Sequence, residues 1–567
     1  MMSKSLLARL IWHKLGKCVW LTALWSVILF FAFPVVALLS STIYRSNPNY
    51  VLSHHPTDDL LNFNNPVCLY FVLIAAVVTA LVIFHYINKK TQVDFFHSQP
   101  VSRGTLFFSN YISGLLIFLV PYAFFWGTAL ISASAGYRGF ALDMPTIVSA
   151  FLVTALFYAV CYSVTVLACT LSGNSAIALF VTFVFFSYGP TAKSCIDLVM
   201  ERFFKTFYYG YPSYGGKTIS LSPVSHFSGF FLNNHDNTSP PPSFMIFYLA
   251  LTVFLMALAY FLYRKRSSES SGNPLSFSFF RPVIKLALMT VIMIISGLIF
   301  YDLKRTPRVD LVLFGVISAQ LASFVILNTV FHFDFKAFFR GWKSLLVFSA
   351  AFVLVFFGMK LNISSYNEAT VKTDNVKSFS FNVPNNISSP TYRYPVVLKD
   401  EKNIEAAVKL HRLAAEKSNK IKYHEKEYSH LSFVFNRKFG FDFSRKYQLL
   451  RSEIEPYSSI ILQSEEYEHQ AVVVPLNAAK SSPSLNVQIE VANFNLTDKA
   501  LQDGLIDAML ADAATSDGNI FHTESDKHFV SIYFGNEYTC LRVPIGDHLT
   551  NTTAFMLENN IPLEPNS

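Results

Sequence analysis

A glycine-rich loop near the middle of the chain is the pattern closest to a nucleotide site. It reads Gly210-Tyr-Pro-Ser-Tyr-Gly-Gly-Lys-Thr218. In a phosphate-binding loop, four residues separate the first glycine from the Gly-Lys-Ser/Thr triplet, because backbone N–H groups and the lysine must surround the same phosphates. Here five residues separate Gly210 from Gly216-Lys217-Thr218, and no strand pattern precedes them. We interpret the segment as an aromatic-rich loop and expect that the chain does not hydrolyse ATP by itself.

No other pattern predicts a catalytic or metal site. His424-Glu425 and His430 resemble a zinc-protease helix, but that motif needs its second histidine at the position of Tyr428. The six cysteines include no CxxC pair, which argues against a zinc site or a disulfide framework. Serine, histidine and aspartate occur without a nucleophile elbow. We therefore predict no catalytic residue, no cofactor and no metal, and a chain that is not itself an enzyme.

Composition indicates that the solvent for much of the chain is a bilayer. Of 567 residues, 52% are hydrophobic and only 14% are charged, whereas about a quarter are charged in ordinary soluble domains. The formal net charge is +8, but the lysines and arginines of the first part flank long apolar runs, where they act as orientation signals. We therefore expect a membrane partner and no nucleic acid.

Apolar runs recur that are long enough to cross about 30 Å of hydrocarbon as helices. The first is too long for a signal peptide and lacks a clear cleavage site, so we interpret it as an uncleaved span. The fourth and fifth are separated only by Leu171-Ser-Gly-Asn174, which we interpret as a tight turn. The nine expected spans are Val19–Leu39, Val67–Ile87, Leu106–Ile131, Ile147–Leu171, Ser175–Tyr188, Phe244–Tyr263, Val283–Phe300, Leu311–Phe331 and Leu345–Met359.

Basic residues predict the orientation of these spans. They precede the first span and follow the second and sixth, at Lys4, Arg9, Lys14, Lys17, Lys89, Lys90, Arg103 and Arg264-Lys-Arg266. Because cytoplasmic loops are enriched in lysine and arginine, these ends should lie in the cytoplasm. Lys304, Arg305 and Arg308 fall in a short outer loop and disagree. Nine spans from a cytoplasmic N-terminus place everything after Met359 outside the cytoplasm, and a miscount by one would reverse this.

The middles of the predicted spans contain no Asp, Glu, Lys or Arg, only polar residues such as Gln320 and Asn328. Proton-driven transporters and pumps usually need an ionisable group within the membrane. If the chain transports, we expect its energy to come from elsewhere. Spans that merely anchor the outer domain are the alternative, although nine are more than anchoring needs.

From Lys360 onward the composition is that of a soluble domain. Segments that alternate apolar and polar residues predict strands at Lys377–Val383, Leu485–Val491 and Phe529–Phe534. Apolar residues at helical spacing predict helices at Asp400–Glu416 and Thr497–Ala511. No internal repeat is visible. The predicted fold class is a mostly α-helical integral membrane protein, with about nine transmembrane helices and a C-terminal α+β extracytoplasmic domain.

The loop between the second and third spans carries the most specific signal. It contains Asp94-Phe-Phe-His-Ser-Gln-Pro-Val-Ser-Arg103. A short amphipathic helix with exposed Phe95 and Phe96, flanked by Asp94 and His97, would suit docking into a groove on a partner. Pro100 should end this helix and Ser102 should cap the next. A plain connector whose aromatic rings dip into the membrane interface is the alternative.

At this loop the chain resembles the type-2 ATP-binding-cassette permeases of Gram-positive and related bacteria, in which a similar residue run precedes the third span. The resemblance implies an interfacial elbow helix at Ser5–Leu15 and a coupling helix at Val93–Ser98 that contacts the ATPase. For Ser5–Leu15, a simple continuation of the first span is the alternative. The residues it assigns to ATPase coupling are Asp94, Phe95, Phe96, His97 and Arg103. A weaker likeness around Tyr394–His411 and Phe433–Tyr447 suggests an outer domain of the kind attached to such permeases, without assigned chemistry.

The usual membrane unit of this family has six spans, and this chain departs from it by adding three spans and an outer domain. We therefore expect four parts: an elbow helix at 1–17, a six-span unit at 18–263, three additional spans at 264–360 and the outer domain at 361–567. The implied partners are two copies of a cytoplasmic ATP-binding subunit and a second permease, either another copy or a sister chain. The expected direction is export, at the bacterial plasma membrane. Spans rich in Phe and Tyr suit an amphipathic substrate such as a peptide, lipid or drug, although lipid-facing aromatic residues explain the same composition without any cargo. A sensory or immunity complex that detects a cell-envelope compound, a membrane enzyme and a scaffold for a surface module remain as other classes.

Overall fold

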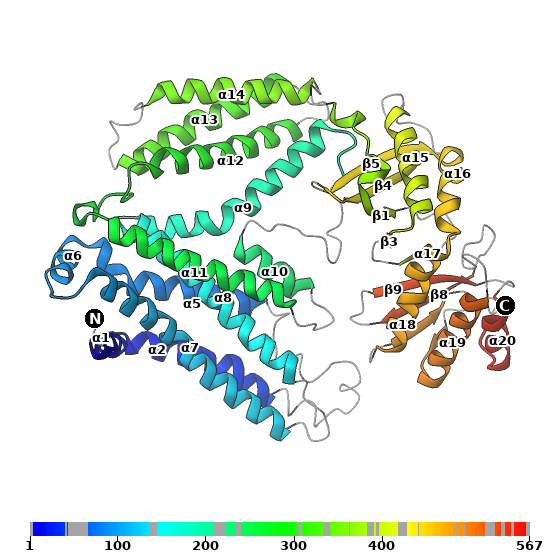
Figure 1. Cartoon of the computed structure of the whole chain (residues 1–567), viewed down its shortest axis with the longest axis horizontal. Helices are drawn as coiled ribbons and strands as arrows, with labels where there is room; N and C mark the ends of the chain where they lie inside the picture. Colours follow the sequence, from blue (N-terminus) through cyan, green and yellow to red (C-terminus); the bar gives the residue numbers. More distant parts are fainter. Residues whose placement is uncertain are drawn as a thin grey trace. The chain divides into compact units, whose positions relative to one another are not determined.

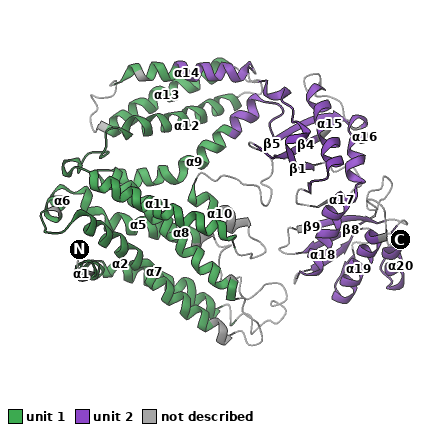
Figure 2. Cartoon of the chain, viewed as in Figure 1, with its two compact units in different colours: residues 1–196, 219–349 green, residues 197–218, 350–567 purple. Residues whose placement is uncertain are grey.

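The computed structural model is mostly helical at the N-terminal side and α+β at the C-terminal side (Figure 1). The structure describes residues 4–39, 42, 66–136, 144–208, 222–233, 240–303, 309–332, 341–361, 363, 365–382, 391–392, 396–417, 428–439, 442–482, 485–490, 494–515, 528–534, 539–545 and 549–562. Two compact units make up the chain (Figure 2): unit 1 holds 1–196 and 219–349, and unit 2 holds 197–218 and 350–567. These limits differ from the domain limits expected from sequence, because unit 2 also takes a segment from the middle of the chain.

The helical elements follow the apolar runs of the sequence. They are α1 (Lys4–Lys17), α2 (Val19–Phe30) continued by η1 (Phe31–Val35), α5 (Pro66–Ile83), η3 (His85–Asn88), α6 (Lys90–His97), α7 (Arg103–Gly136), α8 (Met144–Leu171), α9 (Ser175–Phe203), α10 (Pro223–Asn233), α11 (Pro242–Lys265), η4 (Ser268–Ser270), α12 (Phe280–Asp302), α13 (Val309–His332) and α14 (Trp342–Lys360). The predicted break between the fourth and fifth apolar runs is confirmed, since α8 ends at Leu171 and α9 begins at Ser175.

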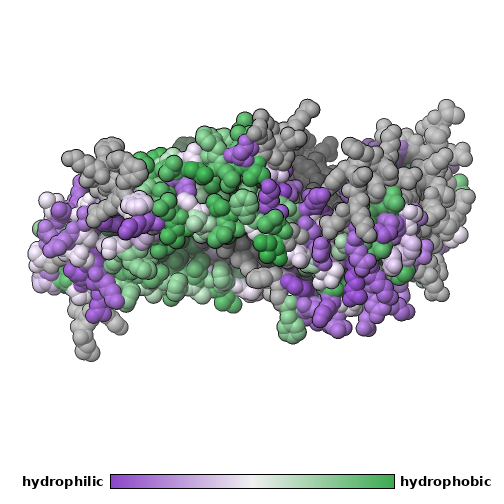
Figure 3. Space-filling model, turned by 90° about the horizontal axis from the view of Figure 1, so that it is seen from above, coloured by the Kyte–Doolittle hydropathy of each residue, from purple (hydrophilic) through white to green (hydrophobic). Residues whose placement is uncertain are grey.

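Seven helices among the described residues are long and apolar enough to cross a membrane. The other two predicted spans correspond to shorter apolar helices, Leu69–Ile83 and Leu345–Lys360. Large hydrophobic side chains such as Phe254 and Val347 are exposed on the helices of unit 1. Figure 3 shows hydrophobic residues covering much of the helical surface in that view. An apolar exterior of this kind is expected of helices that face lipid.

Close packing of aromatic side chains joins α7 to α8. The ring of Phe118 stacks on that of Tyr158, with centroids 4.2 Å apart, and the Tyr158 hydroxyl donates a hydrogen bond to the Gly114 carbonyl, 2.9 Å away. A Cβ on Gly114 would lie 2.0 Å from the Tyr162 hydroxyl oxygen. Glycine at this position leaves room for the buried Tyr162 ring of α8, and small residues of this kind are common between helices in membranes.

Polar contacts hold α12, α13 and α14 together. Lys285, near the start of α12, donates to Asn328 at 2.8 Å and lies over the Phe324 ring at 3.5 Å. The Ser349 hydroxyl on α14 donates to the Gln320 side chain at 2.8 Å. Hydrogen bonds of this kind between apolar helices satisfy groups that have no water to bind. The polar residues noted in the eighth predicted span therefore connect neighbouring helices.

The strands and helices of unit 2 form two α+β lobes. The first lobe contains β1 (Val376–Asn382), β3 (Val397–Leu398), α15 (Glu401–Lys417), β4 (Tyr428–Arg437), β5 (Phe443–Leu450) and α16 (Arg451–Leu462). The second contains β6 (Leu485–Ile489), β7 (Phe494–Leu496), α19 (Lys499–Thr515), β8 (His528–Phe534), β9 (Thr539–Ile545) and α20 (Thr550–Glu558). They are joined by α17 (Glu465–Glu468), η8 (His469–Val473) and α18 (Val474–Lys480). The predicted strands and helices of the C-terminal part are confirmed as β1, β6, β8, α15 and α19.

The two lobes repeat one topology. The first sheet has the order β3-β1-β4-β5, and the second has β7-β6-β8-β9 with β2 (Thr391–Tyr392) added beside β9. In each lobe the chain order is strand, strand, helix, strand, strand, helix, and all strand pairs are antiparallel. The buried stripes of α15 and α19 have the same spacing, with Ile404, Ala407, Val408 and His411 matching Gln502, Leu505, Ile506 and Met509. The structure thus reveals an internal repeat that the sequence hides.

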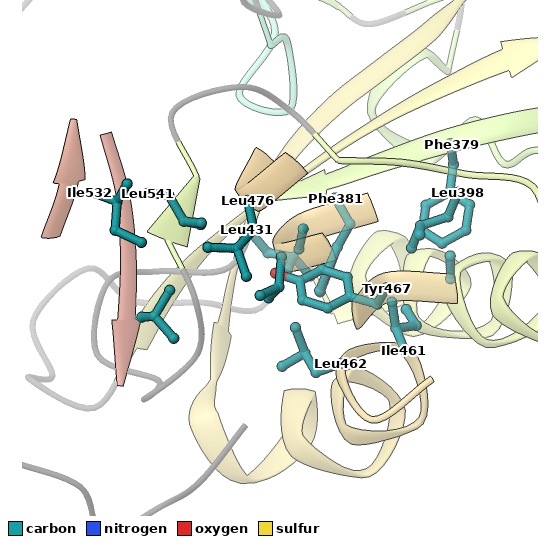
Figure 4. Close-up of a cluster of buried hydrophobic side chains, with 14 of the residues drawn as sticks. Phe379, Phe381, Leu398, Leu431, Ile461, Leu462, Tyr467, Leu476, Ile532 and Leu541 are labelled. Carbon is teal, nitrogen blue, oxygen red and sulfur yellow. The ribbon is translucent and has the colours of Figure 1, made fainter. Parts of the chain in front are cut away.

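One hydrophobic core serves both lobes. It contains β1 and β4 residues from the first sheet, β8 and β9 residues from the second, and side chains of the connecting helices. Figure 4 shows Tyr467 and Leu476 of those helices beside Leu431, with Ile532 and Leu541 of the second sheet nearby. Burial of this shared core favours folding of the two lobes together.

Candidate partner-docking site on helix α6

The predicted amphipathic helix exists as α6, Lys90–His97. It ends where the Ser98 N–H donates to the Asp94 carbonyl at 3.0 Å, and the Ser98 hydroxyl donates to the Phe95 carbonyl at 2.9 Å. The Ser102 hydroxyl oxygen accepts the Thr105 N–H at 3.1 Å, which caps the start of α7 as predicted. The loop is therefore a helix between two well-defined ends.

The two phenylalanines of α6 have different environments. Phe95 leaves 61% of its surface exposed, whereas Val93, two residues earlier, is buried. Phe96 is half-buried and packs edge-on against Tyr86, with ring centroids 5.1 Å apart. Asp94 is exposed, and the His97 side chain lies outside the described part of the structure. Of the two predicted aromatic anchors, Phe95 is exposed and Phe96 packs against its own chain.

Arg103, the fifth predicted coupling residue, contacts its own chain. Its guanidinium donates to the Arg264 carbonyl at 3.3 Å and to the Arg266 carbonyl at 3.0 Å. These carbonyls lie at the C-terminal end of α11, where helices lack internal donors. A cation there also complements the helix dipole. Arg103 thus joins the start of α7 to the end of α11.

The Phe96 contact leads directly to a buried tyrosine pair. The Tyr86 hydroxyl donates to the Tyr263 hydroxyl, 3.1 Å away, and both side chains are buried. The pair links η3, beneath α6, to the end of α11.

A buried arginine, Arg266, organises the chain around this pair. Only 6% of its surface is exposed. Within the described part of the chain its guanidinium donates to the carbonyls of Cys169 (3.0 Å), Thr170 (3.3 Å) and Ile87 (2.8 Å), the Asn88 side-chain oxygen (3.3 Å) and the Ser270 hydroxyl (3.2 Å). We call Arg266 and these five partners the Arg266 cluster.

The Arg266 cluster connects the C-terminal ends of several helices. Cys169 and Thr170 lie in the last turn of α8, and Ile87 lies in η3 just after α5. Burial lowers the pKa of Arg266 to about 10, which still leaves the guanidinium charged at neutral pH. Because carbonyls at helix C-termini carry partial negative charge, they stabilise this cation without a carboxylate. Sequence reasoning treated Arg266 only as an orientation signal and did not predict the cluster.

Two glycines allow the backbone around the cluster to pack closely. A Cβ on Gly173 would lie 2.3 Å from the carbonyl oxygens of Asn273 and Ser270. Gly272 has a φ of +91° and donates its N–H to the Gly173 carbonyl at 2.7 Å. The turn between α8 and α9 is thereby fixed against the segment after α11. η4, within that segment, also contacts α6, so the predicted docking helix rests on the Arg266 cluster.

The metal-like and nucleotide-like patterns of the sequence lie away from α6 or outside the described residues. The described residues contain no group of three or more His, Cys, Asp and Glu side chains placed to hold a metal ion. His430 lies in β4, whereas His424 and the loop 210–218 fall outside the described residues. No family model matches the chain, and no curated protein matches it in sequence. The contacts of α6 thus comprise an exposed Phe95, the Phe96–Tyr86 packing and the contact with η4.

Proposed function

We propose that the chain is the permease subunit of an ATP-binding-cassette transporter. In this proposal a separate cytoplasmic ATPase, present in two copies, supplies the energy, and a second permease completes the membrane part. The cargo is an amphipathic substrate such as a peptide, lipid or drug, and the direction is export. The observation that carries the proposal is α6, which presents Phe95 outward while Val93 and Phe96 fix it to the helices.

An exposed aromatic ring on a short, fixed helix is suited to a protein partner. Aromatic residues buried at the centre of an interface commonly contribute about 2 kcal/mol or more to binding. Phe95 is exposed in this chain, so a partner could bury its ring, and the adjacent exposed Asp94 would lie at the polar rim of such an interface. Because Phe96 and η4 already hold α6 in place, binding of a partner there would cost little conformational entropy.

The contacts beneath α6 provide a route from partner to membrane helices. Phe96 touches Tyr86, Tyr86 bonds Tyr263, and Arg266 bonds the ends of α8 and η3. A displacement of α6 would therefore act on the ends of α5, α8 and α11 together. For ATP binding to drive such a displacement, the partner must bind one arrangement of these helices better than the other.

Helix ends that gather at the Arg266 cluster support nine spans. Lys14, before α2, donates to the Ile83 carbonyl at the end of α5, and His85 bonds Ser175 at the start of α9. Ser276, before α12, donates to the Leu171 carbonyl at the end of α8. The Lys14 bond places the start of α2 and the end of α5 on one side of the bilayer. If α2 crosses away from that side, α5 must cross back to it, where α7 begins beside Arg266. The shorter helix α5 is therefore proposed as a span.

The same reasoning applies to α14. Lys285 near the start of α12 bonds Asn328 near the end of α13, so α13 returns to the side where α12 began. α9 and α14 each start in unit 1 and end in unit 2. Two helices whose last turns belong to one compact unit must end on one side, which requires α14 to cross as well. From the end of α9 to the start of α14 the chain crosses three times, through α11, α12 and α13. A fourth crossing, by α14, then brings its end to the side on which α9 ends.

Charge supports the assignment of the two sides. Four exposed basic residues lie beside the Arg266 cluster: Lys89 and Lys90 at the start of α6, and Arg264 and Lys265 at the end of α11. By the positive-inside rule, this side is cytoplasmic. We therefore propose a multi-pass plasma-membrane protein whose N-terminus is cytoplasmic and in which the two α+β lobes of unit 2 lie outside the cytoplasm.

A sensory or immunity complex is the second candidate function. The observation in its favour is that unit 2 takes in the last turns of α9 and α14, so a compound bound by unit 2 would act on two apolar helices. A membrane enzyme or a simple scaffold would not need the docking surface on α6.

The test is reconstitution in liposomes with a candidate ATP-binding-cassette ATPase from the same genome. We expect no ATP hydrolysis by the chain alone and stimulated hydrolysis by the complex, with Phe95→Ala lowering the stimulation. Hydrolysis by the chain alone, with every contaminating ATPase inactivated, would contradict the permease assignment. Stimulation only in the presence of a cell-envelope antibiotic would favour the sensory function.

A further inference from the structure

The end of α9 is part of the outer domain. Residues 197–218 belong to the same compact unit as 350–567. The described portion of this segment is residues 197–203, the last two turns of α9, followed by Phe204–Tyr208. It comes from a helix that is long and apolar enough to cross a membrane, yet its contacts are those of a component of the β-sheet lobe.

Backbone hydrogen bonding attaches this segment to the free edge of β5. The Lys446 N–H donates to the Thr206 carbonyl at 2.9 Å, and Phe207 forms an antiparallel bridge with Arg445. The Ser444 hydroxyl donates to the Tyr208 carbonyl at 3.0 Å. An exposed sheet edge normally offers unpaired N–H and C=O groups to any passing strand. Here the chain covers part of that edge with its own mid-sequence segment.

Side chains reinforce the backbone contact. The Thr206 hydroxyl donates to the Asn367 side-chain oxygen at 3.1 Å, and the Phe204 ring packs on Tyr366 with centroids 4.4 Å apart. Phe204 and Thr206 are buried. The Arg445 guanidinium lies 3.7 Å from the centre of the Tyr366 ring and donates to the Tyr366 hydroxyl at 2.9 Å.

The same residues connect to α14. Tyr366 and Asn367 follow shortly after its last residue, Lys360. Phe203 in the last turn of α9 packs edge-on against Phe356 of α14, with ring centroids 5.4 Å apart. The ends of these two helices are thus joined directly and through the first lobe.

The second lobe shows that covering this edge is a property of the repeated fold. β9 occupies the place in the second sheet that β5 has in the first, and its outer edge is paired with β2. Thr391 and Tyr392 of β2 pair with Arg542 and Leu541. Thr206–Tyr208 therefore does for β5 what β2 does for β9.

We propose that Phe204–Tyr208 is an integral edge strand of the outer domain and acts as a clamp, holding the ends of α9 and α14 to that domain as one body. An outer domain attached only through α14 could rotate freely about one connection. Attached through both helices, it restrains their separation, and any ligand of the domain acts on both. This inference does not depend on the transport function.

Hydrogen exchange of the full-length chain in nanodiscs tests the clamp. The double variant Phe204→Ala with Asn367→Ala should make the amides of β5 exchange about ten-fold faster, because the Lys446 N–H loses its cover. The matched control is Glu201→Gln, which removes only the exposed ion pair to Lys446 at 3.5 Å and should change exchange by less than about two-fold. Unchanged exchange in β5 of the double variant would overturn the proposal.

A disulfide test covers the case in which the double variant does not fold. In a chain with its native cysteines replaced, Thr206→Cys with Asn367→Cys should form a disulfide on mild oxidation, found by mass spectrometry. The bond should form both without and with the cognate ATPase and ATP, since the clamp moves as one body. Absence of the bond under both conditions, or its formation under only one of them, would overturn the proposal.

Discussion

Phe96 packs edge-on against Tyr86, with ring centroids 5.1 Å apart. Through Tyr86 it contacts Tyr263, whose helix ends at the residue before Arg266. Phe95, the next residue back, is exposed. Adjacent residues of one short helix thus have separate tasks in the proposed mechanism, and substitutions can separate them.

Phe95→Ala should weaken assembly with the ATPase by about 2 kcal/mol or more while leaving the membrane part folded, because an interface anchor is lost. Phe96→Ala should lower the stability of the chain by about 2 kcal/mol, because the Tyr86 contact and part of a buried cluster are lost. Affinity of the purified subunits in nanodiscs and thermal melting of each variant measure the two effects.

Asp94→Ala is the control for Phe95→Ala, since an exposed rim charge contributes less than about 1 kcal/mol. Equal ATPase affinity for the wild type and Phe95→Ala would mean that the ring rests in the lipid interface instead of a partner groove.

Arg266→Met should destabilise the membrane part by about 2–4 kcal/mol, since the substitution leaves buried carbonyl oxygens at the ends of α8 and η3 without a donor. Arg266→Lys should recover only part of the loss, because an ammonium cannot repeat the planar set of bonds. Thermal melting in detergent measures both. Lys265→Met, at an exposed neighbour, should have little effect on stability. A comparable loss of stability in that control would show that the buried hydrogen bonds of Arg266 are not the cause.

The sequence was sufficient to predict the elements that depend on local pattern. Long apolar runs became α2, α7, α8, α9, α11, α12 and α13, and alternating segments became β1, β6 and β8. The helix at α6 was also predictable, because Pro100 and Ser102 mark its end and the next start. These features need only residue types within a short window.

Features that depend on long-range contacts were not predictable. Arg266 bonds residues from two distant segments, and nothing in its neighbourhood distinguishes it from Lys265. The two lobes share topology and buried spacing, but matching positions carry unlike residues, such as His411 and Met509. Only the fold shows that Thr206, in the middle of the chain, belongs beside β5.

His411 should make the stability of the outer domain depend on pH. It is fully buried, bonds the Tyr447 hydroxyl at 3.0 Å and has a pKa lowered to about 4, mainly by burial and further by Arg445 and Arg412. The unfolded chain binds a proton at His411 near pH 6.5, whereas the folded chain binds it only near pH 4. The neutral His411 therefore contributes its full share to the free energy of unfolding above about pH 6.5. This contribution, about 3 kcal/mol, is lost as the pH is lowered toward about 4.

Thermal melting of unit 2 at a series of pH values between 7.5 and 4.5, with hydrogen exchange as the readout of unfolding, measures this dependence. His411→Met, which copies the residue at the matching position of the second lobe, should flatten it. His469→Gln changes an exposed histidine and should leave it as in the wild type. A His411→Met profile as steep as that of the wild type would assign the pH dependence to other groups.

Cysteine labelling tests the proposed sides of the membrane. Cys540 is partly buried and burial raises its thiol pKa, so it should react slowly in any topology. Leu557→Cys places a thiol at a site with 67% exposure and should react with an impermeant reagent on intact cells. Lys17→Cys, at the end of α1, should react only after permeabilisation. The reverse pattern would invert the proposed topology.

The central claim is that an ATP-binding-cassette ATPase docks on α6, and photo-cross-linking in living cells tests it most directly. With p-benzoylphenylalanine in place of Phe95, light should produce an adduct whose partner contains a phosphate-binding loop by mass spectrometry. The same group in place of the exposed Leu557 of α20 should produce no such adduct. If position 95 yields only lipid adducts, or none with an ATP-binding-cassette protein, the docking site and the permease function built on it are wrong.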